Sequence, residues 1–276
     1  MKLSSRFGHN AHALRSRTPL SEDQLRSVAP SIFAEAAHDS RSERYTYIPT
    51  STVLTGLQKE GFQPFMVAQT RVRDEGKRDF TKHMIRLRHP SQINDTEANE
   101  VILLNSHDGT SSYQMVAGLL RFVCMNGLVC GETVTDVRVR HKGQIVDNVI
   151  EGAFKVLDGF KLVREVRDDM RAITLAPAEA AAFGRAALAL KYEPDATKPA
   201  PITETQLLAP RRTADAGSDL WSTFNRVQEN IVQGGLQMKS TNGRRMSTRA
   251  VAGIDSSVKV NRALWMLAEE MRRLKA

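Results

Sequence analysis

Seven basic side chains gather within eighteen residues that have the period of two β-strands and the turn between them. They are Arg71, Arg73, Lys77, Arg78, Lys82, Arg86 and Arg88. Strand alternation places arginines two residues apart on one face, about 6.6 Å from each other. That repeat is close to the phosphate spacing of an extended strand, so the pattern favours a surface that follows a nucleic-acid backbone without reading bases. The alternative is a solvated sheet edge whose charges oppose aggregation.

Two further basic groups lie later in the chain. The first comprises Arg138, Arg140 and Lys142, together with His141; the second lies in a polar, glycine-bearing loop between two helices and comprises Lys239, Arg244, Arg245 and Arg249. The net charge of +8 over 276 residues is typical of proteins with a polyanionic partner, although many basic proteins bind no nucleic acid. Because aromatic residues make up only 6% of the chain, we expect phosphate contacts to contribute more than base stacking.

The segment 105–112 is the one candidate for catalysis. It combines His107 and Asp108 with serine and threonine hydroxyls, so a hydrolase or nuclease is an alternative function. A GxSxG motif is absent, and adjacent His and Asp side chains rarely orient one another as a catalytic triad requires. The structural interpretation is that Asp108, with Thr110 or Ser111, caps a following helix while His107 holds the loop.

The spacing of the other candidate ligands predicts neither a metal site nor a cofactor. Seven histidines form no HExxH motif, and Cys124 and Cys130 match neither a zinc site nor a disulfide framework. A phosphate-binding GxxxxGK[ST] loop is also missing. We therefore expect no intrinsic catalytic centre.

The elements that must position these residues follow from hydrophobic periodicity. Helices are predicted at 52–59, where Gly61 ends the helix, and at 111–125, 145–160 and 177–192; strands are predicted at 65–73, 80–88, 101–104, 128–130 and 133–140. Their order does not alternate as βαβ, so the sequence predicts an α+β fold. In this fold an antiparallel sheet with a basic β-hairpin packs against helices, and a C-terminal helical pair is added.

The chain is expected to comprise four parts. These are an N-terminal arm at 1–44, an α+β core at 45–192, a proline-rich linker at 193–217 and a C-terminal helical segment at 218–276 that packs on the core. Trp221, Phe224, Leu264 and Trp265 are expected in the core of the helical pair, with amide hydrogen bonds between the two helices. No apolar run is long enough to cross a bilayer and no secretory signal is visible, so we expect a cytoplasmic protein.

Three segments resemble a family of uncharacterised plasmid- and prophage-encoded proteins. They are LLNSHDGTSSYQMVAGLLRFVCMNGLVCG at 103–131, DLWSTFNRVQENIVQGG at 219–235 and VNRALWMLAEE at 260–270. The resemblance extends from Tyr45 onward and implies a task in a bacterial mobile element, such as recombination, replication, anti-restriction or plasmid maintenance.

The arrangement of helix, basic hairpin, strand and helix is also similar, more loosely, to single-strand annealing recombinases of the phage beta-protein type. That resemblance implies rings or filaments that bind single-stranded DNA without ATP hydrolysis, and it assigns no individual residue. The expected function is sequence-independent binding of single-stranded nucleic acid. The protein is further expected to anneal complementary strands and to form homo-oligomers. A non-enzymatic factor that binds an acidic host protein would use the same positive charge.

Overall fold

The computed structural model describes residues 11–41, 47–94, 96–124, 126–130, 137–138, 145–192, 200–239, 244–251 and 253–276. The chain forms two compact units, which divide within its longest helix near residue 160. Unit 1 contains the N-terminal elements through the first half of that helix, and unit 2 contains most of the chain after residue 160. None of the helices in the described ranges is long and apolar enough to cross a membrane.

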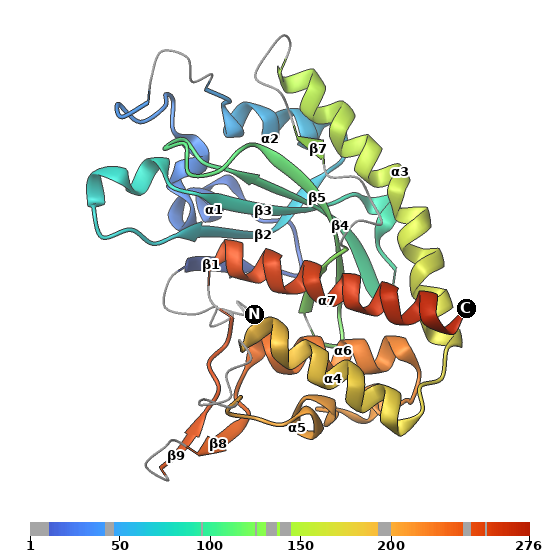
Figure 1. The fold of residues 1–276 in the computed structure, drawn as a ribbon. Coiled ribbons are helices and arrows are strands. Elements are labelled where there is room, and N and C mark those ends of the chain that lie inside the picture. Colours follow the sequence, from blue (N-terminus) through green and yellow to red (C-terminus); the bar gives the residue numbers. More distant parts are fainter. Residues whose placement is uncertain are drawn as a thin grey trace. The chain divides into compact units, whose positions relative to one another are not determined.

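A seven-stranded sheet forms the centre of unit 1 (Figure 1). Six strands follow one another in chain order and the seventh pairs with β5: β1 (Ala11–Arg15), β2 (Gln63–Thr70), β3 (His83–Arg88), β4 (Glu97–Asn105), β5 (Gln114–Arg121), β6 (Asn126–Val129) and β7 (Val137–Arg138). The registers from β1 through β5 are antiparallel throughout. The predicted α+β class with an antiparallel sheet is therefore confirmed.

Strand β4 lies between β3 and β5, and all nine of its residues are buried. Its run Val101–Leu104 is apolar on both faces, as a strand in the middle of a covered sheet must be. The strand predicted at 101–104 is confirmed as part of β4. Strands β2 and β3 also match the two predicted strands, although β2 ends at Thr70 and β3 begins only at His83.

Helices cover one face of this sheet. They are α1 (Glu22–Val28), the 3-10 helix η1 (Pro30–Phe33), α2 (Thr50–Lys59) and the first half of α3 (Ile145–Ala172). In α2, Val53, Leu54 and Leu57 recur at helical spacing and are buried, and the left-handed Gly61 (φ +90°) follows the helix end as predicted. Helix α3 packs on α2 closely enough that a Cβ on Gly56 would lie 3.1 Å from Ile150.

The helix predicted at 111–125 is wrong, because this segment contains strand β5. Its run MVAGLL is continuously apolar, so a helical spacing could be read from residues that actually alternate between two buried faces. Pairing with β4 determines the outcome: Ile102 lies opposite Val116 and Leu103 opposite Met115. The strands β6 and β7 replace the short strands predicted at 128–130 and 133–140.

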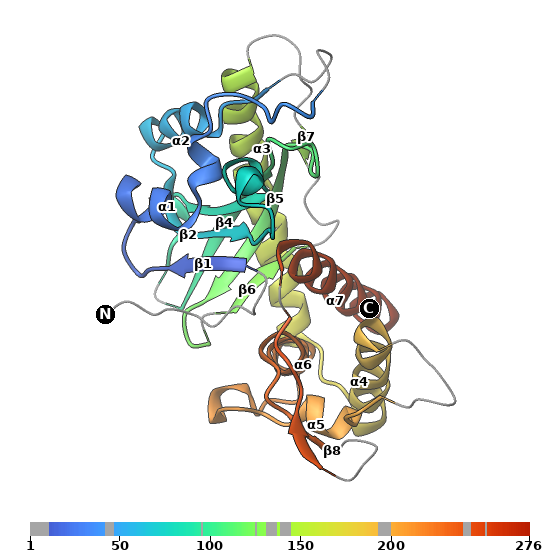
Figure 2. The ribbon, with the colours of Figure 1, turned by 90° about the vertical axis from the view of Figure 1, so that its left-hand side faces the viewer.

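Unit 2 is mainly helical (Figure 2). It contains the second half of α3, α4 (Pro177–Lys191), α5 (Glu204–Leu208), the 3-10 helix η4 (Thr213–Asp215), α6 (Leu220–Gln233) and α7 (Ile254–Lys275). The rings of Trp221, Phe224 and Trp265 lie 5.6–6.3 Å apart and are buried, as expected from the sequence. Gln228 Nε2 on α6 donates to Asn261 Oδ1 on α7 at 2.7 Å, which confirms the predicted amide bond between the helices.

The predicted domain boundaries at 44, 192 and 217 remain predictions. The structure adds that β1, which comes from the expected arm, pairs with β2 as the first strand of the sheet. It also places α5 and η4 within the segment expected to be a linker.

Candidate nucleic-acid interface

The connection between β2 and β3, residues 71–82, is called the hairpin tip. A 3-10 helix, η2 (Glu75–Phe80), forms its middle, and residues 71–79 are all exposed. Gln69 Nε2 donates to the Arg78 carbonyl at 2.7 Å, and Thr81 Oγ1 donates to the Thr70 carbonyl at 3.2 Å. Side-chain bonds from the sheet thus hold both ends of the tip in place.

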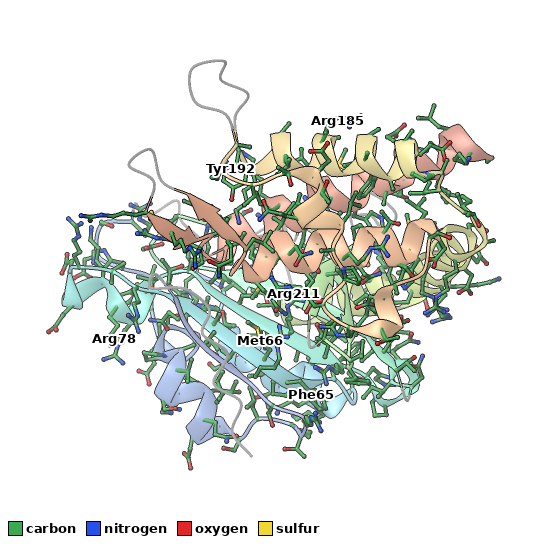
Figure 3. All side chains as sticks on the ribbon, turned by 90° about the horizontal axis from the view of Figure 1, so that it is seen from below. Phe65, Met66, Arg78, Arg185, Tyr192 and Arg211 are labelled. Carbon is green, nitrogen blue, oxygen red and sulfur yellow. The ribbon has the colours of Figure 1, made fainter. Side chains whose placement is uncertain are left out.

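Four predicted cationic residues lie exposed on the hairpin tip: Arg71, Arg73, Lys77 and Arg78. Figure 3 shows Arg78 on the outer side of this tip, while Phe65 and Met66 come from the body of β2. Asp74, Glu75 and Asp79 lie in the same segment and offset most of this positive charge. Lys82 is half-buried, and Val72 is exposed. The tip is therefore a mixed-charge surface with a small positive excess.

Arg86 and Arg88 do not belong to this surface, and their predicted place on an exposed basic face is wrong. Their exposed fractions are 3% and 2%. Arg86 Nη1 lies 2.9 Å from one carboxylate oxygen of Glu100, and Arg88 Nε lies 2.9 Å from the other. Strand β3 lies between β2 and β4, and all six of its residues are buried, so a charge on either face needs an internal partner.

We call Arg15, Arg86, Arg88 and Glu100 the arginine cluster. Burial lowers the pKa of Arg15 to about 10, with a further lowering from the positive charge of Arg86. Burial alone would raise the pKa of Glu100, but the charges of Arg86, Arg88 and Arg15 outweigh it, so the net shift is downward. Glu100 therefore stays ionised and stabilises the buried guanidinium groups. The cluster has a structural role in the sheet and leaves Arg86 and Arg88 no access to a polyanion.

Strands β8 (Gln237–Lys239) and β9 (Arg245–Ser247) form a separate two-stranded sheet in unit 2, which we call the ribbon. It projects beyond α4, α5 and α6 in both ribbon views (Figures 1 and 2). All three residues of β9 are exposed. The ribbon is therefore a protruding element, most of whose surface is open to solvent.

Hydrogen bonds fix the base of the ribbon to the helices. Gln206 Nε2 on α5 donates to the Gln237 carbonyl at 2.7 Å, and Lys191 Nζ on α4 donates to the carbonyls of Ile231 and Arg249 at 2.8 and 3.3 Å. Arg211 donates to Asn230 Oδ1 at 2.7 Å and to the Gly234 carbonyl. In Figure 3, Arg211 lies among the unit 2 helices. The ribbon thus has a firmly held base and an exposed end.

The ribbon and its flanks carry the third predicted basic group. Arg244, Arg245 and Arg249 are exposed, and Lys239 is the last residue of β8. The register places Lys239 opposite Arg245. The sequence from Gln237 to Arg249 contains no aspartate or glutamate, so nothing within this segment offsets the charge, in contrast to the hairpin tip.

The second predicted basic group is described only in part. The backbone of Arg138 lies in β7, opposite Gln114 of β5. Arg140 and Lys142 lie outside the described residues. The structure therefore neither adds this group to the interface nor removes it.

The loop 105–112 connects β4 and β5 and caps no helix. The His107 ring is buried, with Nε2 3.5 Å from Thr50 Oγ1. The Asp108 carboxylate instead accepts hydrogen bonds from the Thr110 backbone N–H at 3.0 Å and from its hydroxyl at 2.6 Å. The two adjacent side chains therefore occupy different environments, and Asp108 stabilises a turn rather than orienting the imidazole.

His107 belongs to a buried polar network under α2. His83 Nδ1 lies 2.9 Å from Ser31 Oγ, and His83 Nε2 lies 3.1 Å from Thr50 Oγ1. Burial lowers the pKa of His83 to about 3 and that of His107 to about 4. Both imidazoles are therefore neutral near pH 7. The network joins helix α2 and η1 to the sheet through buried polar side chains. No three His, Cys, Asp or Glu side chains in the described ranges gather to hold a metal ion.

Sequence reasoning missed the partners that define these buried groups. Glu100 gave a signal, because a carboxylate directly before the apolar run of β4 needs a cation on a neighbouring strand if it is buried. Arg15 gave none, because its role depends on the pairing of β1 with β2, whose partner residues lie more than fifty positions apart in the sequence. Ser31 and Thr50 likewise become visible only once η1 and α2 are placed over the sheet.

Comparison with known proteins identifies relatives along nearly the whole chain. It is 54% identical over 270 residues to the UPF0380 protein YafZ of Escherichia coli (strain K12), covering 98% of this chain and 97% of that protein. It is 53% identical, with the same coverage, to the UPF0380 protein YfjQ of the same organism. No solved structure matches the chain. Residues 37–265 match the model of a domain of unknown function, DUF932, and the chain therefore belongs to the DUF932 family.

Proposed function

We propose that the protein binds single-stranded nucleic acid independently of sequence, through the ribbon and its flanking arginines. The observation that carries the proposal is an exposed, projecting pair of strands with four basic residues and no acidic one between Gln237 and Arg249. The hairpin tip supplies a second contact through Arg71, Arg73, Lys77 and Arg78. Arg86 and Arg88 are excluded from the interface because Glu100 holds them inside the sheet.

Phosphate neutralisation explains why this surface would bind any sequence. Each lysine or arginine that pairs with a phosphate releases a condensed counterion, and this gain does not depend on the base. On a single strand, the logarithm of affinity then falls with the logarithm of salt concentration by about 0.7 per contact. Because the ribbon is fixed at its base, little backbone order has to be gained when a strand binds it.

The proposal extends to strand annealing by a homo-oligomer in the service of a plasmid or prophage. Its support is the resemblance to mobile-element proteins and annealing recombinases, together with the place of β1 at the end of the strand order, where its outer edge pairs with no strand of the described residues. Sedimentation at micromolar protein, with and without oligonucleotide, tests assembly. A single 30 kDa species under both conditions would defeat this extension without affecting simple binding.

The central test compares Arg245→Ala and Arg249→Ala with the parent by fluorescence anisotropy on 30-nucleotide strands of several sequences. We expect weaker binding to all sequences alike and a salt slope smaller by about 0.7 per lost contact between 50 and 200 mM salt. Arg185→Ala is the matched control, because Arg185 is an exposed cation of the same unit that already pairs with Glu204 at 3.4 Å.

Two results would overturn the proposal. If the ribbon variants bound as tightly as the parent and Arg185→Ala, the ribbon would not be the site. If the parent bound no strand at 50 mM salt, the basic surface would instead fit an acidic protein partner, which is the alternative function. The hydrolase alternative gains no support from the loop 105–112, where His107 is buried and Asp108 bonds Thr110.

A further inference from the structure

The ribbon carries an apolar pair as well as positive charge. Met238 and Met246 lie directly opposite each other in the β8–β9 register, so they share one face. Met246 is 45% exposed and Met238 is half-buried. The side chains of Arg245 and Ser247, one residue to either side of Met246, alternate to the opposite face.

Met246 exposes its thioether among charged residues on a projecting strand, whereas Trp221 and Trp265 are buried in the helical core of the same unit. A two-stranded ribbon is also marginally stable without a further layer. Methionine on a protruding element is typical of binding surfaces, because its flexible and polarisable side chain adapts to flat aromatic partners.

We infer that the Met238–Met246 face contacts the unpaired bases of the bound strand, an inference that rests on the proposed function. A nucleic-acid strand running along the outer edge of β9 presents its bases to one side and its phosphates to the other. Met246 then lies against base π-faces, and Arg245, on the opposite face, reaches the phosphates. The strong positive charge of the segment selects a nucleic acid over an apolar protein as the occupant of this face.

The two contacts differ in their dependence on salt and ligand. A phosphate contact releases counterions, whereas a thioether–base contact does not. Because sulfur–aromatic contacts contribute about 0.3–1.5 kcal/mol, loss of Met246 should weaken binding roughly two- to tenfold without changing the salt slope. A base contact should also be absent when the ligand has phosphates but no bases.

The experiment measures dissociation constants of the parent, Met246→Ser and Arg245→Ala for a 20-nucleotide thymidine strand, inorganic polyphosphate and a 20-base-pair duplex. We expect Met246→Ser to weaken binding of the single strand at every salt concentration and to leave polyphosphate binding unchanged. Arg245→Ala should weaken binding of both and reduce the salt slope. Met266→Ser is the matched control, because Met266 is 41% exposed on α7 of the same unit.

Separate outcomes distinguish the base contact from the proposed function. If Arg245→Ala weakens binding but Met246→Ser binds the single strand like the parent, the base contact is wrong and the proposed function stands. An equal effect of Met246→Ser on polyphosphate, or on the duplex, also overturns the assignment to unpaired bases. If neither the parent nor any variant binds these ligands, both the proposed function and this inference fail.

Oxidation by peroxide gives a second measurement on the unmodified protein. Mass spectrometry of the peptides follows conversion of Met246 to its sulfoxide, with Met266 as the internal reference. Bound thymidine strand should slow oxidation of Met246 more than that of Met266, and polyphosphate should not. Equal rates for Met246 with and without a strand that demonstrably binds would contradict the inference.

Discussion

Two pairs of residues show how far the sequence determines the chemistry of single side chains. Arg86 and Arg88 have the type and spacing of a phosphate-binding stripe, as Arg71 and Arg73 do. The difference is Glu100 on the next strand, which converts the first pair into an internal ion pair. Alternation along one strand cannot show whether a face is covered, because covering depends on elements distant in sequence. The exposed cations of the hairpin tip could be predicted, and the buried ones could not.

His83 and His107 make the stability of unit 1 depend on pH. Their pKa values in the folded protein, about 3 and about 4, lie below the unfolded value of about 6.5. The unfolded chain therefore binds more protons, so the free energy of unfolding is highest above pH 6.5 and falls as pH decreases toward 4. Each imidazole contributes a slope of up to about 1.4 kcal/mol per pH unit in this window.

Urea denaturation followed by circular dichroism at several pH values between 7.5 and 4.5 measures this slope. The double variant His83→Gln, His107→Gln should show a much shallower decline than the parent, whatever its absolute stability. Above pH 4.5 most carboxylates remain ionised, so they add little to the difference. Parallel curves for the parent and the double variant would show that these imidazoles do not titrate on unfolding.

At the scale of elements, β5 is where the local hydrophobic pattern and the pairing with neighbouring strands indicate different secondary structures. The residues of segment 111–125 have helical spacing, yet two neighbouring strands make it a strand that is buried on both faces. Helix α2 had no such competition, since its apolar stripe, its polar face and Gly61 all indicate the same element. Helix α2 could therefore be predicted from its own residues, whereas β5 required knowledge of the strands that pair with it.

The base of the ribbon gives a prediction at this scale. Gly234 has φ +64°, and a Cβ there would lie 2.6 Å from the Arg249 carbonyl carbon and 2.7 Å from the Thr248 oxygen. Gly235 has φ +79°, but nothing lies within 4 Å of its Cβ position. Gly235→Ala should therefore lower the free energy of unfolding only by the cost of holding alanine in the left-handed backbone conformation, about 1–2 kcal/mol. Gly234→Ala should lower the free energy of unfolding distinctly more, because the backbone at Thr248 and Arg249 must also move to make room for the new Cβ.

Urea unfolding of the two variants, followed by tryptophan fluorescence, measures the difference in the free energy of unfolding. Both tryptophans, Trp221 and Trp265, lie in the helical core of unit 2, so the signal reports the unit that contains the ribbon. Under the proposed function, Gly234→Ala should also weaken binding of single strands more than Gly235→Ala does. Equal destabilisation by the two substitutions would show that the backbone at the base of the ribbon can shift at Gly234 without a measurable loss of stability.

At the scale of the whole molecule, the α+β class was predictable because the order of elements excludes βαβ units. The division into two units was harder to see, since it occurs within α3, which runs without a break from Ile145 to Ala172 although the sequence predicts a helix only at 145–160. Each unit has a core of its own: the sheet with its covering helices in unit 1, and the Trp221–Phe224–Trp265 group in unit 2. Separate cores make separate unfolding possible.

We therefore expect two unfolding transitions that single substitutions shift independently. Glu100→Gln leaves Arg86 and Arg88 buried without their counter-charge, and breaking a buried ion pair in this way costs about 3–5 kcal/mol. Trp265→Ala removes the largest buried side chain of unit 2, at a similar cost. Circular dichroism follows both units in urea, so Glu100→Gln should lower the midpoint of the unit 1 transition in that signal and leave the tryptophan fluorescence transition in place. Trp265→Ala should instead destabilise unit 2 alone, so the circular dichroism transition of unit 1 keeps its midpoint. Should Glu100→Gln shift both signals together, the continuous helix α3 couples the units into one cooperative structure.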